Sequence, residues 1–231
     1  MNTAPASSTS VPTRLDRWSG ACWIGAGVLL LLGTLHPDIF STTLAEVSRR
    51  AVWVPVHIAG LVAVVLTLVG LTGLYGTRAE RLGTLGAVGL VCAVVGLVMT
   101  ACVAYAEALL LPLIAPDHPE VFDWDGPVTT SLAVRATTGM ALLWLVGLVL
   151  LGVALWRSGL VPAGAGLTLA VAAVAFSVFG GLLIPVLAPL STLALAVGYA
   201  WVGLALWTGA TGASGARRSE GQRALAGDRR D

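Results

Sequence analysis

The fold is decided by an uncharged, apolar segment at residues 54–75, which reads VPVHIAGLVAVVLTLVGLTGLY. A helix of about 20 residues, rising about 1.5 Å per residue, crosses the hydrocarbon core of a bilayer. Apolar and polar residues do not alternate in this segment, as they would in a strand of a membrane β-barrel. The segment therefore predicts a transmembrane helix.

The whole chain has the same character. Of its 231 residues, 57% are hydrophobic and 11% are charged, whereas soluble domains carry roughly 25% charged residues. We expect an all-α polytopic membrane helix bundle over residues 17–209. Lipid offers no hydrogen-bond partners, so only helices and closed barrels satisfy their backbone groups within a membrane. Six transmembrane helices are predicted, at residues 18–36, 54–75, 84–111, 132–156, 164–185 and 191–209.

The arginines predict the orientation of these six helices. The chain has thirteen arginines and no lysine, and ten of the arginines lie on one side of the predicted spans: before the first span, at 76–83, at Arg157 and in the C-terminal tail. Cytoplasmic segments carry the excess of positive charge in membrane proteins. We therefore expect a protein of the cell membrane with both termini in the cytoplasm, which agrees with an even number of spans.

The two ends of the chain differ in composition from the bundle. Residues 1–16 are rich in Ser, Thr, Pro and Ala, and residues 210–231 are rich in Gly, Ser and Arg. Such segments bury too little apolar surface to fold, so we expect two disordered cytoplasmic tails. The expected partner is the lipid bilayer. Nucleic-acid binding is not expected, because the arginines form short clusters at membrane edges and no broad basic face.

Few ionisable side chains fall within the predicted spans or at their ends, and those that do lie at one level. His36 ends the first span, His57 begins the second, Glu107 lies late in the third and Arg135 begins the fourth. With the predicted orientation, all four residues lie near the outer boundary of the bilayer. Ionisable residues within membrane spans are costly and commonly functional, so each one is a candidate site residue.

The small residues of the second and third spans predict which way the polar side chains point. Small residues recur every three or four positions, a pattern that lets membrane helices approach closely. His57 continues one such stripe and Glu107 ends another, so both should face protein. The stripes are His57, Gly60, Ala63, Thr67 and Gly70, and Gly86, Gly89, Ala93, Gly96, Thr100, Ala104 and Glu107.

Several readings of this polar cluster remain open. In the simplest, Glu107 forms a structural ion pair with Arg135, and the histidines only bond backbone carbonyls. In a second, His36, His57 and Glu107 bind a metal, since two imidazoles and a carboxylate are the donors of several zinc sites. In a third, His36 and His57 hold a haem, and in a fourth Glu107 handles protons or a substrate.

Short patterns around these residues resemble a loose group of small six-helix integral membrane proteins of high-GC bacteria. The patterns are Leu35-His36-Pro37, the segment from Trp53 to His57, and Tyr105-Ala106-Glu107. The resemblance covers most of residues 17–209 and implies the six-helix fold. No established activity accompanies that group, so the resemblance implies no function.

The sequence therefore leaves two classes of function. No GxSxG, Walker or Rossmann-type glycine motif occurs, and this favours a non-enzymatic membrane protein whose polar cluster serves packing. The alternative is a membrane-embedded enzyme or transporter that uses a metal or haem at His36, His57 and Glu107. The catalytic residues and the cofactor of such an enzyme are not predicted.

Overall fold

The structure is a computed structural model that describes residues 12–37, 43–123, 125–180, 184 and 186–212. In this part of the chain the secondary structure is helical, without strands. The α-helices are α1 (Arg14–Leu30), α2 (Leu44–Ser48), α3 (Trp53–Tyr105), α4 (Leu111–Ile114), α5 (Leu132–Ala141), α6 (Leu143–Ser158), α7 (Ala163–Ala175) and α8 (Leu187–Thr208). Short 3₁₀ helices cover Leu31–Leu35 and Pro119–Val121, and π-helical turns cover Ala106–Leu110 and Phe176–Gly180.

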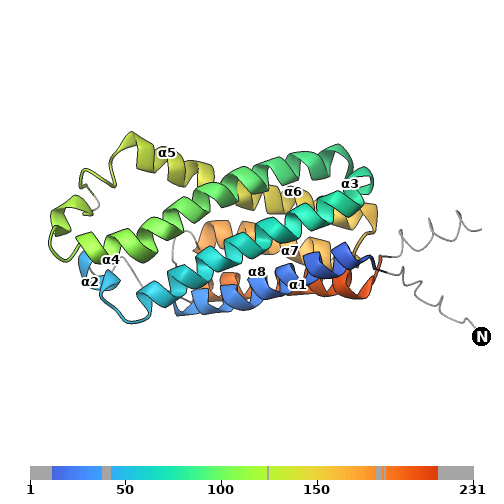
Figure 1. The fold of residues 1–231 in the computed structure, drawn as a ribbon, viewed down its shortest axis with the longest axis horizontal. Helices are drawn as coiled ribbons and strands as arrows, with labels where there is room; N and C mark the ends of the chain where they lie inside the picture. Colours follow the sequence, from blue (N-terminus) through green and yellow to red (C-terminus); the bar gives the residue numbers. More distant parts are fainter. Residues whose placement is uncertain (1–11, 38–42, 124, 181–183, 185, 213–231) are drawn as a thin grey trace, which may run out of the picture.

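The six predicted spans are confirmed. Five helical stretches of the described chain are long and apolar enough to cross a membrane. The longest of them, Trp53–Ile114, contains Gly83, whose φ of 61° lies in the left-handed region that favours glycine. The chain reverses there, so α3 consists of two antiparallel halves that lie side by side (Figure 1). Together with the other four stretches, these two halves make six helical segments of membrane-spanning length.

The predicted boundaries are wrong at two places. The first helix begins at Arg14, within the predicted disordered tail, because Thr13 and Asp16 form a capping box at its start. Residues 76–82 continue α3 where a loop was expected, since Ala, Arg, Glu and Leu in this segment favour helix until Gly83 breaks it. The rest of the two predicted tails, residues 1–11 and 213–231, lies outside the described residues.

The bundle has two ends, which we name the Gly83 end and the Trp53 end. At the Gly83 end, α1 begins and α8 finishes, and Gly212 donates a backbone hydrogen bond to Gly159 after α6. At the opposite, Trp53 end lie α2, α4 and α5, with α5 standing apart from α1 and α8 (Figure 1). The predicted polar residues all lie at the Trp53 end.

Small residues hold the helices close together, as the predicted stripes require. Gly86, Gly89, Ala93 and Gly96 are buried, and this face of α3 packs on α6. A Cβ added to Gly96 would overlap the backbone of Trp144 in α6. The stripe in the first half of α3 is also buried, apart from the half-buried Gly60. The prediction that His57 faces protein is confirmed, because only 7% of its surface is exposed.

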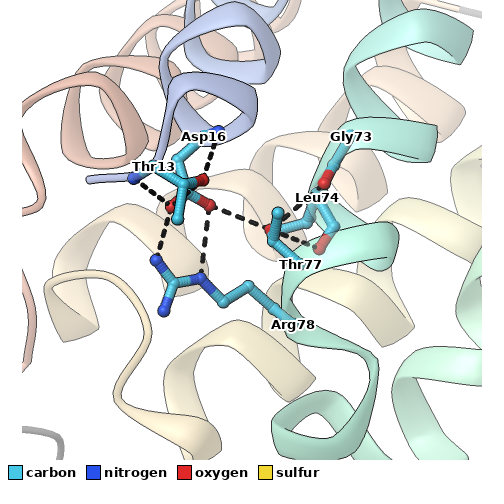
Figure 2. Close-up of polar contacts among 6 residues, drawn as sticks. All are labelled: Thr13, Asp16, Gly73, Leu74, Thr77 and Arg78. Atoms are coloured by element: carbon cyan, nitrogen blue, oxygen red, sulfur yellow. Dashed lines mark hydrogen bonds and ion pairs between the residues drawn. The ribbon is translucent and has the colours of Figure 1, made fainter.

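A buried ion pair fixes α1 to the first half of α3 at the Gly83 end (Figure 2). Asp16 is 1% exposed and accepts hydrogen bonds from Arg78 Nη2 at 2.6 Å and from Thr77 Oγ1 at 2.9 Å. Its carboxylate also accepts from the backbone N–H and the hydroxyl of Thr13 at 2.9 and 2.8 Å. The contact sets how α1 lies against α3, and therefore how His36 meets His57 at the other end.

Candidate functional site

The site begins with two side chains one turn apart in α3. Trp53 and His57 have i, i+4 spacing, so they lie on the same face of the helix. Their ring centroids are 4.2 Å apart, and Trp53 is 2% exposed. Thr43 caps the short helix α2 that precedes them, its hydroxyl accepting a hydrogen bond from the Glu46 N–H at 3.2 Å. Val47 of α2 belongs to the same apolar cluster as Trp53, and this packing keeps the start of α3 buried.

Glu107 lies in a π-helical turn that leaves its own carbonyl without a helical partner. In this turn the Leu111 N–H donates to the Ala106 carbonyl, and the next residue, Pro112, has no N–H. The indole N–H of Trp53 donates to the free carbonyl of Glu107 at 2.7 Å. This bond joins the two halves of α3 at the Trp53 end. It brings the Glu107 side chain next to His57, and π-helical turns of this kind are frequent at functional sites.

His57 and Glu107 contact each other directly. His57 Nε2 lies 3.4 Å from Glu107 Oε2, and the other ring nitrogen, Nδ1, lies 2.7 Å from the carbonyl oxygen of Trp53. A carbonyl only accepts hydrogen bonds, so Nδ1 carries a proton. In a neutral imidazole Nε2 is then an acceptor that faces a carboxylate. A positive species, either a proton or a cation, is needed between these two atoms.

His36 completes the cluster from the end of the first span. His36 directly follows a 3₁₀ helix over Leu31–Leu35. Nδ1 of His36 lies 2.8 Å from the carbonyl oxygen of Pro37. Its ring contacts the rings of His57 and Trp53, with centroids 5.1 and 5.5 Å away. The structure therefore brings His36, His57 and Glu107 together, as their common level in the membrane predicts.

The predicted ion pair between Glu107 and Arg135 is not formed. Arg135 Nε donates instead to the Thr129 carbonyl at 3.4 Å, and Glu107 pairs with His57. The reason is the position of α5, which stands apart from much of the bundle and is exposed along most of its length (Figure 1). Both residues do line the same cavity, from different helices.

That cavity, of about 1260 Å³, lies between α5 and the rest of the bundle at the Trp53 end. It exceeds the roughly 300–1,000 Å³ of common small-molecule pockets. Apolar side chains such as Leu30, Val103 and Phe176 form most of its lining. The polar lining consists of five threonines, His36, Glu107 and Arg135. The second π-helical turn contributes Phe176 and Gly180, so both π turns of the described chain border the cavity.

The metal and haem hypotheses find little support in this geometry. Among the described residues, no three His, Cys, Asp or Glu side chains are arranged to hold a metal ion. A bis-histidine haem needs its macrocycle between the two imidazoles. The rings of His36 and His57 contact each other edge to face at 5.1 Å between centroids, which leaves no room for one. Metal binding at these residues stays a prediction.

Comparison with known proteins found no matching family model, no similar curated protein and no similar solved structure. The resemblance to small membrane proteins of high-GC bacteria therefore stays a prediction. The function has to be argued from the site itself.

Sequence reasoning missed two residues that organise the molecule. Trp53 was named only as the start of a short pattern that ends at His57, although its i, i+4 spacing to His57 is a signal for a shared face. Asp16 was assigned to the disordered tail, although Thr13 and Asp16 have the spacing of a capping box. No sequence signal, apart from Pro112, indicates the π-helical turn at Glu107.

Proposed function

We propose that this protein is a non-enzymatic membrane protein that binds one lipid-like amphiphile in the cavity beside α5. The observation that carries the proposal is the lining of the cavity. Apolar side chains form most of its wall, and charged side chains occur at only a few places on it. Ligand pockets combine apolar walls with a few polar groups that orient the ligand. A molecule with an apolar body and a polar head fits this division.

The membrane setting supports the same proposal. We propose that the protein lies in the cell membrane with the Gly83 end in the cytoplasm, because the arginine excess falls at that end. The cavity then lies in the outer half of the bilayer. Lipid reaches it from the side, since α5 is exposed along most of its length and carries apolar side chains such as Leu132 and Met140.

The orientation is tested separately from binding. A reporter fused after Asp231, and a second one inserted next to Gly83, should both be cytoplasmic. Labelling of either reporter from outside intact cells would contradict this orientation. The cavity would then lie in the inner half of the bilayer.

Binding is tested by native mass spectrometry of the protein released from a neutral detergent. The wild type should retain one lipid-sized adduct per chain. The variant Ala133→Trp, which adds a bulky side chain to the cavity wall, should lose the adduct. The matched control Val171→Trp adds the same side chain to a lipid-facing position of α7 that does not line the cavity, and should keep it. Equal retention by the two variants would refute a ligand in this cavity.

A further inference from the structure

The cluster of His36, His57 and Glu107, here called the polar corner, presents three hydrogen-bond acceptor groups, and two of these residues, His36 and Glu107, line the cavity. Nδ1 of His57 and Nδ1 of His36 each face a backbone carbonyl, at 2.7 and 2.8 Å, so each of these nitrogens must be the donor. In the neutral imidazoles, both Nε2 atoms are then acceptors. The third acceptor is the Glu107 carboxylate, which lies 3.4 Å from His57 Nε2.

These acceptors have no matching donors in the described part of the chain. Oε1 of Glu107 has no hydrogen-bond partner there, and the side chain is 44% exposed towards the cavity it lines. Polar groups removed from water are costly unless they are paired. The chain contains no lysine, so no ammonium side chain of this protein can supply the missing donors and positive charge.

A primary ammonium group has the complementary chemistry. It carries one positive charge and three N–H donors, which the Glu107 carboxylate and His36 Nε2 on the cavity lining can accept. A quaternary ammonium carries the charge but no N–H donor. The polar corner therefore distinguishes the two kinds of head group by hydrogen bonding and not by charge.

Another residue of the cavity lining offers a site for an anion. Arg135 of α5 lines the cavity and uses only Nε, which donates to the Thr129 carbonyl. Within the described chain its two terminal nitrogens have no partner, and a guanidinium binds phosphate through paired N–H groups. The remaining lining is largely apolar and suits acyl chains.

From this arrangement, and resting on the proposed function, we infer that the ligand is an aminophospholipid. Its primary ammonium group binds at Glu107 and His36, its phosphate binds at Arg135, and its acyl chains fill the apolar part of the cavity. A single proton shared by His57 and Glu107 is the competing arrangement. It would satisfy those two atoms without a ligand and would leave the cavity indifferent to the head group.

The experiment is a competition measured by native mass spectrometry. The full-length protein in neutral detergent receives equal amounts of phosphatidylethanolamine, phosphatidylcholine and phosphatidylglycerol with identical acyl chains. Charge-assisted hydrogen bonds predict that the ethanolamine lipid binds roughly tenfold or more tightly than the choline lipid. Glu107→Gln should abolish this preference. Arg135→Gln should weaken the binding of all three phospholipids, and Thr72→Val, an uncharged change at an exposed position of α3 that does not line the cavity, should alter neither property.

The other outcomes separate the two proposals. Equal binding of the three lipids by the wild type would overturn the aminophospholipid assignment while leaving the proposed function standing. Absence of any bound lipid would overturn both. Displacement of the bound lipid by an equal concentration of soluble phosphoethanolamine would assign the polar corner to a water-soluble amine and would overturn the lipid assignment. Circular dichroism of each variant checks that the helical bundle is retained.

Discussion

Breaking the ion pair between Asp16 and Arg78 should destabilise the bundle unequally, depending on which partner is removed. Asp16 is 1% exposed and Arg78 is 21% exposed, so the carboxylate cannot reach water while the guanidinium partly can. Removing one partner of a buried pair costs about 3–5 kcal/mol. We expect Arg78→Met to lower the free energy of unfolding by about 5 kcal/mol, because it leaves the buried Asp16 carboxylate without a compensating charge. Asp16→Asn should cost about 3 kcal/mol, since Arg78 turns to water and the amide keeps part of the hydrogen bonding.

The assay is reversible unfolding in mixed micelles with increasing dodecyl sulfate, followed by circular dichroism. The double variant Asp16→Asn with Arg78→Met should cost no more than the Arg78→Met change alone, because no uncompensated charge remains. Two results would refute the reasoning that burial of the carboxylate decides the loss of stability. One is a double variant whose loss equals the sum of the two single losses. The other is a larger loss for Asp16→Asn than for Arg78→Met.

Two further stability predictions use the same assay. Gly96→Ala should destabilise the protein by about 1–3 kcal/mol, because the new methyl group overlaps the backbone of α6, whereas Gly60→Ala should not, because nothing lies within 4 Å of the added Cβ. Trp53→Phe should cost about 1–3 kcal/mol by leaving the Glu107 carbonyl unpaired, and Trp18→Phe, at an exposed indole, should be close to neutral. Equal effects within either pair would contradict the packing or the hydrogen bond described.

The transmembrane architecture could be predicted because it depends on local properties. Hydropathy over about 20 residues gives the six crossings, and glycine periodicity gives the buried face of each half of α3. The common level of His36, His57 and Glu107 also follows from counting residues along neighbouring spans. Their convergence follows from this common level together with the small-residue stripes that turn His57 and Glu107 towards protein.

The partner of Glu107 could not be predicted, because level in the membrane does not give position around the bundle. Arg135 has the expected level, but its side chain bonds the Thr129 carbonyl, and the group that reaches Glu107 is His57 on the same hairpin. The hairpin closes through a bond between the Trp53 indole and a carbonyl freed by the π-helical turn. Such a bond depends on tertiary packing, and no pattern of residue types encodes it.

The most direct test of a ligand in the cavity uses Cys102, an exposed thiol of the cavity lining. A variant with Cys22→Ser and Cys92→Ser leaves it as the single cysteine. Its rate of labelling by a small uncharged maleimide is measured at alkaline pH in neutral detergent, with and without saturating phosphatidylethanolamine. A bound lipid should slow the labelling, and the additional change Glu107→Gln should raise the lipid concentration needed for this protection roughly tenfold. Labelling that proceeds equally fast with and without the lipid would contradict a ligand in this cavity.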